Sequence, residues 1–355
     1  MTVTVAMPRS RSVVRLLRVA AFAVAAVVIY ALVLWQAIQV FQGLSSDKAF
    51  PVALQQTVNA LSIGAIYALI ALGYTMVYGI IELINFAHGD VFMVGAFLSI
   101  VLTGGIFGQT GGVTDIPFLA LLIVVALAFV MPLTGILNMT IERVFYRPFR
   151  HASRLAPLIT AVGVSFILQN LALIVAGSGD RGAPQVFPLE WQIPVGGASI
   201  SILSIFIFVL AITLMAALQA FVSRTRLGRA MRATAQDQQA AQLMGVDLNQ
   251  TIALTFLLGG SLAGAAGVVW GLRFGWVRQD LGFNAGLKAF TSAVLGGIGN
   301  ITGAALGGFV IGFVENFAAS LGFSRWSEFL VFAMLTFVLI FRPTGILGQQ
   351  LGDRA

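Results

Sequence analysis

The sequence predicts an all-α fold, a polytopic transmembrane helical bundle of about nine or ten membrane segments. Its 355 residues are 59% hydrophobic and only 9% charged, whereas soluble domains usually carry about 25% charged residues. Apolar runs of about 18 residues or more, each long enough to cross a bilayer, recur along the chain. A membrane β-barrel would instead show alternating segments of about ten residues. These observations favour helices that span a membrane.

The apolar runs predict one span near the N-terminus and seven further spans. In the first, 18–42, the apolar residues 19–35 follow four arginines, an arrangement that is also found in signal peptides. This apolar stretch is longer than the usual core of about 7–15 residues, and no clear cleavage site follows, so we expect an uncleaved helix. The other predicted spans are 54–80, 91–107, 117–141, 155–177, 199–222, 250–271 and 328–342.

Basic residues gather in a few short clusters between these spans, which is typical of topology signals rather than of nucleic-acid binding. Fourteen of the twenty Lys and Arg residues fall in the N-terminal tail, the loops 142–154 and 223–249, and the C-terminal tail. The positive-inside rule puts this side, and both termini, in the cytoplasm. The loop 272–288, with Arg273, Arg278 and Lys288, is then external and violates the rule mildly.

A glycine-rich segment near 288–318 does not fit a simple span. If the C-terminus is cytoplasmic, residues 288–317 enter and leave the membrane on the same side. A broken pair of short helices that turns at "GGIGNITG" (296–303) satisfies this requirement. Irregular backbone at membrane depth is tolerated only inside protein or beside a cavity. Small residues four apart, as in Gly260/Gly264, Gly303/Gly307 and Gly308/Gly312, predict close helix packing.

The stretch "ELINFAHGD" (82–90) places three ionisable residues, Glu82, His88 and Asp90, between long apolar runs. We expect a polar turn at the cytoplasmic end of a span, where Gly89 breaks the helix and polar side chains cap the exposed backbone. The alternative is that the segment lines a solute pathway opposite "GGIGNITG". A zinc site is disfavoured, because no second histidine lies nearby. The candidate pathway residues are Asn85, His88, Asp90, Gly297, Gly299 and Asn300.

Several classes of chemistry are excluded by missing residues. The chain has no cysteine, and neither of its lysines lies in a G-x-x-x-x-G-K-[ST] phosphate loop. It also lacks the H-E-x-x-H motif of zinc proteases. The chain therefore cannot hydrolyse ATP through such a phosphate loop, and we expect no cofactor, metal or enzymatic activity of its own. A secondary transporter, a channel and one part of an ATP-driven transporter remain open at this point.

The loop "SRTRLGRAMRATAQDQQAAQLMGVDLNQ" (223–250) is too long for a simple turn. Its Ala, Arg, Gln, Leu and Met residues predict a helix over 229–244 that stops at Gly245. A passive basic loop would explain the arginines but not a long projecting helix. We interpret this helix as a docking surface for a soluble partner.

A family resemblance then becomes specific. "QAAQLMG" (239–245) resembles the E-A-A-x-x-x-G core of ABC importer permeases, with Gln239 in place of the usual Glu. "GAIYALIALGYTMVYGIIELINFAHGD" (64–90), "IERVFYRPFR" (141–150) and "ITAVGVSFILQN" (159–170) resemble LivH-type permeases of branched-chain amino acid ABC importers. So do "RLGRAMRATAQD" (226–237) and "AFTSAVLGGIGNITGAALGGFVIG" (289–312). The resemblance covers about residues 52–347, and 18–42 looks like an addition to the family pattern.

The resemblance implies a half-pore in a bacterial inner membrane. Such a permease pairs with a LivM-type sister permease, two cytoplasmic ATPases and an extracytoplasmic solute-binding protein. It also implies a domain division into 1–51 (basic tail and extra helix), 52–347 (permease domain) and 348–355 (cytoplasmic tail). The residues expected to seat the ATPase are Arg229, Arg232, Gln239, Ala240, Ala241 and Gly245.

Alternatives remain open from the sequence. A proton-coupled secondary transporter would use His88 and Asp90 as a relay, since ionisable residues within spans often serve in this way. A gated channel would allow passive flux. Relatives of the same importer class also carry urea or short amides, and no aromatic box or paired charges in the sequence define an amino-acid pocket.

Overall fold

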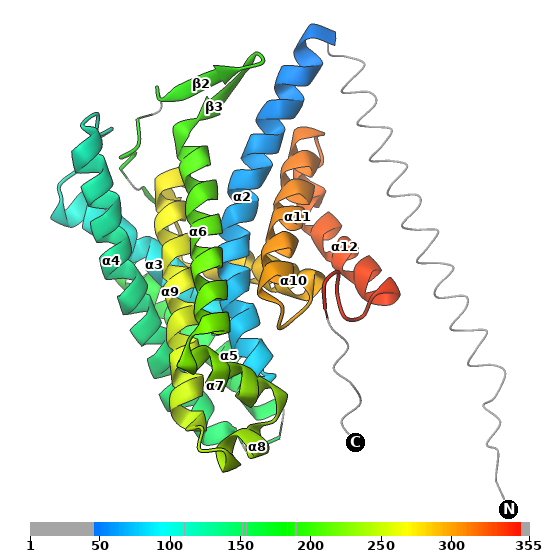
Figure 1. The fold of residues 1–355 in the computed structure, drawn as a ribbon. Coiled ribbons are helices and arrows are strands. Elements are labelled where there is room, and N and C mark those ends of the chain that lie inside the picture. Colours follow the sequence, from blue (N-terminus) through cyan, green and yellow to red (C-terminus); the bar gives the residue numbers. More distant parts are fainter. Residues whose placement is uncertain are drawn as a thin grey trace, which may run out of the picture.

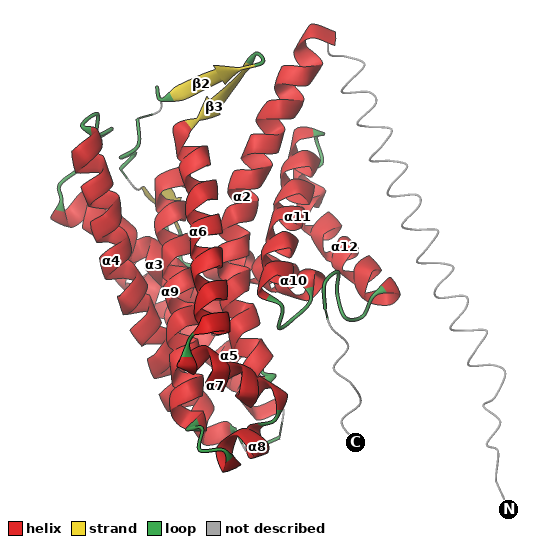
Figure 2. Cartoon of the chain, viewed as in Figure 1, coloured by secondary structure: helices red, strands yellow, loops and turns green. Residues whose placement is uncertain are grey.

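The computed structural model describes residues 46–348, apart from residues 110, 151, 154, 183 and 189, and is built almost entirely of helices (Figure 1, Figure 2). The predicted all-α fold is thereby confirmed. The predicted first span, 18–42, lies outside the described residues. The α-helices are α2 (Ser46–Ile81), α3 (Ala87–Ile100), α4 (Ile116–Ile141), α5 (Leu155–Ala176), α6 (Ile202–Arg224), α7 (Arg226–Gln236), α8 (Gln238–Leu243), α9 (Leu248–Phe274), α10 (Leu281–Gly296), α11 (Ile301–Ser320) and α12 (Ser327–Phe341).

Within the described residues, 8 helical segments are long and apolar enough to cross a membrane. Seven coincide with the predicted spans after residue 45, with boundaries that differ by a few residues, and the eighth is α11. Two of these segments do not end as α-helices. Helix α3 continues into a π-helix, Val101–Ile106. Helix α4 continues into a π-helix, Glu142–Tyr146, and then into a 3-10 helix, Arg147–Phe149. A further 3-10 turn, Ser324–Trp326, precedes α12.

The long helix α2 lies at the centre of the bundle, where it packs against α9, α10, α11 and α6. Glycines bring the backbones of α2 and α11 together. A Cβ added to Gly312 would lie 2.4 Å from the backbone of Gly64, and one added to Gly308 would lie 2.4 Å from the backbone of Ala68. Such contacts require hydrogen as the side chain, since no Cβ fits in that space.

Helices α4 and α9 meet through small residues in the same way. A Cβ at Gly260 would lie 2.6 Å from the carbonyl oxygen of Thr134, and one at Gly264 would lie 2.1 Å from the Thr134 hydroxyl. The four-residue glycine spacings thus serve close packing within the chain, as the sequence predicts.

The predicted broken segment is present as the hairpin of α10 and α11. Its turn uses the left-handed backbone of Gly297 (φ 108°) and Gly299 (φ 87°), a conformation that is readily available to glycine. Asn300 begins α11, because its Oδ1 accepts the backbone N–H of Gly303 at 3.0 Å. The Asn300 amide also donates to the carbonyl of Leu347 at 2.9 Å, which ties the turn to the segment after α12.

The predicted external loop 272–288 is wrong in its extent. Helix α9 continues to Phe274 and α10 begins at Leu281, so Lys288 lies within a helix and not in a loop. Only 275–280 connect the two helices, and there Arg278 Nε donates to Asp280 Oδ1 at 2.5 Å. This hydrogen bond raises the pKa of the Arg278 guanidinium above its ordinary value.

Two small antiparallel sheets lie among the connections. Strand β1 (Arg181–Gly182) pairs with β4 (Trp276–Val277), and β2 (Gln192–Val195) pairs with β3 (Ala198–Ser201) in a hairpin. The β2–β3 hairpin lies at the end of the bundle opposite α7 and α8 (Figure 1). The two ends of the molecule therefore differ, one carrying a strand hairpin and the other two short helices.

Candidate functional site

The loop between α6 and α9 folds as two short helices rather than the single helix expected over 229–244. Thr225 caps α7 through a bond from the Gly228 N–H to its Oγ1 at 2.9 Å. Asp237 is extended (φ −154°, ψ 113°) and ends α7, and its Oδ1 accepts the Ala240 N–H at 2.9 Å. The chain breaks here because an N-cap at Asp237 satisfies donors that a continuous helix would have bonded internally.

Helix α8 presents two large apolar side chains to its surroundings. Leu243 is 88% exposed and Met244 is 85% exposed. The chain stops the helix just after them, at Gly245, whose φ of 84° is left-handed. Apolar side chains held out this far at the tip of a compact loop are typical of a surface that a partner covers.

The six residues predicted to seat a partner all lie in these two helices or at their end. Five are exposed, namely Arg229, Arg232, Gln239, Ala240 and Gly245, and Ala241 is buried. Arg232 turns back and donates through Nη1 to the carbonyl of Val222, which holds α7 against the end of α6. Gln238 donates to the Ile80 carbonyl at 3.3 Å and so connects α8 to the last turn of α2.

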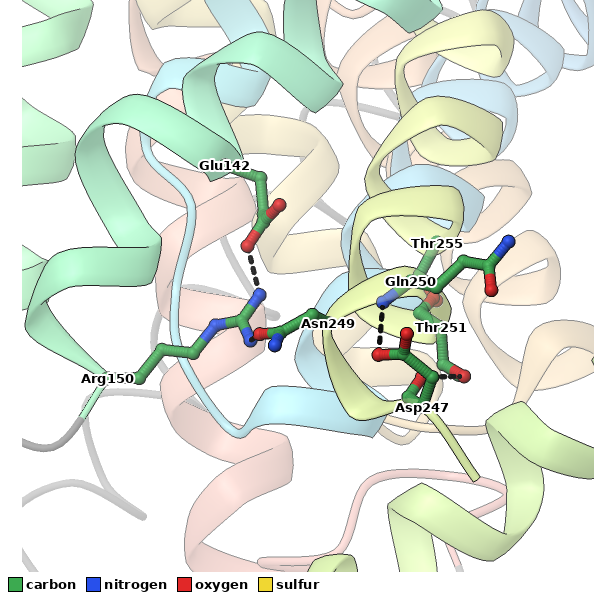
Figure 3. A network of polar contacts seen from close by, with 7 residues as sticks. All are labelled: Glu142, Arg150, Asp247, Asn249, Gln250, Thr251 and Thr255. Carbon is green, nitrogen blue, oxygen red and sulfur yellow. Dashed lines mark hydrogen bonds and ion pairs between the residues drawn. The ribbon is translucent and has the colours of Figure 1, made fainter. Parts of the chain in front are cut away.

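A second polar network anchors the same end of the bundle (Figure 3). Arg150 forms an ion pair with Glu142 and also donates through Nη1 to Asn249 Oδ1 at 2.8 Å. Asp247 caps α9, because its Oδ1 accepts the Gln250 N–H at 3.1 Å. The basic segment after α4 is thereby tied to the beginning of α9, immediately after the exposed tip.

The expected polar turn at 82–90 is wrong in its geometry. Helix α2 ends at Ile81, Glu82 adopts a positive φ of 55°, and α3 begins at Ala87 with no side-chain cap. Gly89 lies inside α3 and does not break it. A Cβ there would lie 2.2 Å from the Gly282 carbonyl oxygen, so this glycine permits the close approach of α10.

His88 and Asp90 lie in the packed interior, with no exposed surface. The His88 ring fits against Gly73 and makes an edge contact with Tyr74 at a centroid distance of 4.7 Å. The Ser165 hydroxyl of α5 donates to Asp90 Oδ2 at 2.5 Å. In the part of the chain that is described, no three His, Cys, Asp or Glu side chains gather as metal ligands do.

Asn85 belongs to a buried network that the sequence analysis missed. Its amide donates to Asn138 Oδ1 at 3.2 Å, Tyr146 Oη donates to Asn85 Oδ1 at 3.0 Å, and Asn138 donates to the Phe256 carbonyl at 2.7 Å. These bonds hold the linker 82–86 against α4 and α9. Asn138, Glu142 and Tyr146 are spaced four residues apart in an otherwise apolar segment, so they lie on one face of it. That spacing is the sequence signal from which a buried polar network could have been predicted.

A cavity of about 690 Å³ opens beside α7. Of the predicted pathway residues, Gly299 and Asn300 line it, whereas Asn85, His88, Asp90 and Gly297 do not. Glu82 and Arg232 place one negative and one positive side chain on its wall. The cavity therefore lies between the end of α2, the end of α6, helix α7 and the α10–α11 turn.

The fold defines a polytopic helical membrane protein with an exposed loop of two short helices at one end. The family described as "Branched-chain amino acid transport system / permease component" matches residues 56–339, and the chain belongs to that family. No solved structure matches.

Curated relatives extend over nearly the same region. The high-affinity branched-chain amino acid transport system permease protein BraD of Pseudomonas aeruginosa is 45% identical over 302 residues, which cover 83% of this chain and 96% of the relative. The corresponding LivH protein of Escherichia coli K12 is 40% identical over 309 residues, covering 85% and 98%. A probable LivH of Methanocaldococcus jannaschii is 27% identical, covering 82% and 91%. The resemblance to LivH-type permeases is thereby confirmed.

Proposed function

We propose that the chain is a membrane-spanning permease subunit of an ATP-driven importer for branched-chain or related small amino acids. The observation that carries this proposal is the exposure of Leu243 and Met244 at the tip of α8. Two apolar side chains next to the basic helix α7 suit a groove on a soluble ATPase. In this proposal the long apolar helices span the membrane, and the α7–α8 loop binds the ATPase.

The contacts of α7 support a way to pass movement from the ATPase to the bundle. Helix α7 packs against α2, α6 and α9, and α8 holds the end of α2 through Gln238. When ATP draws the two ATPases together, α8 moves with them and shifts α7 against α2. Because Arg232 of α7 and Gly299 of the α10–α11 turn line the same cavity, this shift changes the shape of the cavity.

We assign Glu82, Gly299 and Asn300 to the inner mouth of the solute pathway, since they line the cavity. Asn85, His88 and Asp90 then act on the pathway indirectly, by fixing where the linker 82–86 and the first turn of α3 lie. Gly297 supports the α10–α11 turn from its buried position. A proton relay through His88 and Asp90 gains no support from their sealed surroundings.

The assembly that we propose follows the family resemblance. Residues 52–347 form the permease domain and pair with a LivM-type sister permease. Two ATPases bind at the α7–α8 end, which faces the cytoplasm with both termini, and a solute-binding protein docks at the end that carries the β2–β3 hairpin. The location is a bacterial inner membrane. The relatives' names, which refer to branched-chain amino acid transport, favour that solute over urea or short amides.

The docking proposal is tested with the double variant Leu243→Asp/Met244→Asp. Charges at both tip positions prevent burial in an apolar groove, so we expect copurification of the ATPase with the permease to fall by about tenfold or more. Arg226→Gln, an exposed change at the start of α7, is the control and retains the ATPase. Undiminished ATPase binding by the double variant would contradict the proposal.

A further inference from the structure

A cluster of charged side chains joins α2, α10, α11 and α12 at a distance from the cavity described above. Lys288 Nζ lies 2.6 Å from Glu315 Oε1 and 3.9 Å from Glu328 Oε1. The Tyr67 hydroxyl donates to the other oxygen of Glu315, Oε2, at 2.7 Å. One ammonium thus faces two carboxylates, and one of those carboxylates is also held by a phenol.

Three members of the cluster lie within segments that are apolar enough to span a membrane, and Lys288 lies on α10, the first helix of the hairpin that packs among them. Tyr67 belongs to the span Phe50–Ile81, Glu315 to Ile301–Ser320 and Glu328 to Ser324–Phe341. Glu315 is near the end of α11 that points away from α7 and α8 (Figure 1). The charges therefore lie in the half of the bundle opposite the proposed ATPase-docking end.

These charges are not fully enclosed by the chain. The Lys288 side chain is 12% exposed, that of Glu315 is 20% exposed and that of Glu328 is 63% exposed. Asn284, one helical turn before Lys288 on α10, is exposed as well. Charged groups within spans face water-filled space or protein rather than lipid, because hydrocarbon does not solvate them. This side of α10, α11 and α12 is therefore a wet or partner-covered face.

We propose that Lys288, Glu315 and Glu328 form a subsite that receives the charged end of an α-amino acid zwitterion on its way through the importer. The proposal rests on the proposed function and specifies its substrate class. The ligand carboxylate takes a place on the Lys288 ammonium, and the ligand ammonium takes a place between Glu328 and Glu315. Each charge exchanges one partner of opposite sign for another, so passage leaves no charge unpaired.

The balance of charges makes the subsite selective. With two carboxylates to one ammonium, the protein has an excess negative charge that favours a ligand bearing a cationic group. A solute without charges, such as urea or a short amide, has no ammonium or carboxylate to offer in exchange. Such a solute would leave the Lys288–Glu315 ion pair intact and would not bind at the subsite.

The first test uses the neutral pair Lys288→Met/Glu315→Gln in the full importer reconstituted in proteoliposomes, with L-leucine as the probe. Leucine uptake and ATP hydrolysis are measured together. We expect ATPase activity stimulated by the binding protein to stay within about twofold of wild type, and leucine moved per ATP to fall by about tenfold. Arg278→Gln/Asp280→Asn removes an exposed ion pair elsewhere and is the matched control, expected to keep the wild-type ratio.

An unchanged ratio of leucine to ATP in the neutral pair would overturn the subsite and leave the charges a purely structural link between helices. The proposed function fails in a different way, namely if the wild-type assembly shows no ATP-dependent uptake at all. The two failures are therefore distinguishable in one set of measurements.

A second test does not depend on whether the neutral pair folds. Because the chain has no cysteine, Asn284→Cys introduces a single thiol one turn from Lys288. In the assembled importer we expect a cationic, membrane-impermeant thiol reagent to label it, and leucine supplied with the binding protein to slow labelling about threefold. Val209→Cys, on the exposed apolar face of α6, is the control, and we expect it to stay unlabelled. Labelling that is absent at residue 284, or indifferent to leucine, would overturn the proposal.

Discussion

The His88 ring of α3 lies close against α2 because residue 73 has no side chain. A Cβ at Gly73 would lie 2.3 Å from His88 Nε2 and 2.9 Å from the Gly259 carbonyl oxygen, so an added methyl group would meet both the ring and the backbone of α9. The imidazole thus acts as a large, rigid packing element within a membrane bundle.

This packing predicts the effect of Gly73→Ala. Overpacking against a fixed ring costs about 1–3 kcal/mol, so we expect a lower midpoint of thermal unfolding for the purified permease. Gly163→Ala is the control, because nothing lies within 4 Å of a Cβ at that position of α5. There the gain in helix propensity, about 1 kcal/mol, should leave stability equal or higher. Equal midpoints for Gly73→Ala and wild type would contradict the packing account.

Asn138 supports a second prediction at this scale. Asn138→Leu removes the acceptor of the Asn85 amide and the second donor to the Phe256 carbonyl of α9, and a buried unpaired amide costs about 1–3 kcal/mol. We expect a clear loss of thermal stability, measured in the same assay. Asn170→Leu removes a hydrogen bond to the Phe166 carbonyl at an exposed site of α5 and should change stability little. If the two variants lost stability equally, the buried network would not be the cause.

At the scale of elements, the break between α7 and α8 depends on one cap. Asp237→Ala removes the acceptor for the Ala240 N–H, which costs about 0.5–2 kcal/mol of local helix stability. We expect α8 to fray and ATPase affinity to fall about threefold to tenfold, as measured by titration of the ATPase onto the permease. Asp237→Ser keeps an N-cap oxygen and should restore most of the affinity. A failure of Ser to do better than Ala would show that the carboxylate charge matters instead.

The spans were predictable because a long apolar run in lipid has few options besides a helix. The linker 82–86 was not, because its path depends on a hydrogen bond that Asn85 donates to Asn138 and one that it accepts from Tyr146, and both residues are far away in the sequence. The break at Asp237 was missed because the surrounding Ala and Gln residues favour helix strongly, and a single cap outweighed them. Local propensity therefore predicted which segments are helical but not where they stop.

At the scale of the whole molecule, we propose separate tasks for the two ends of the bundle. The α7–α8 end was recognisable from its arginines and from "QAAQLMG", since both are contiguous in sequence. The charged cluster was not, because it joins Lys288 to a glutamate 27 residues away and, through that glutamate, to a tyrosine 248 residues from it. The sequence predicted that Lys288 belongs to an external loop, whereas in the structure it lies in α10, which packs against α2 and α11.

The account as a whole predicts active import that depends on ATP and not on a proton gradient. Its most direct test is leucine uptake into proteoliposomes that contain this chain with its proposed sister permease, ATPases and binding protein, with and without a protonophore. We expect leucine uptake only when ATP is present on the side of the membrane that carries the ATPases. The protonophore should leave this uptake unchanged, and the double variant Leu243→Asp/Met244→Asp should abolish it. Uptake that proceeds without the ATPases and collapses with the proton gradient would contradict the account and identify a secondary transporter.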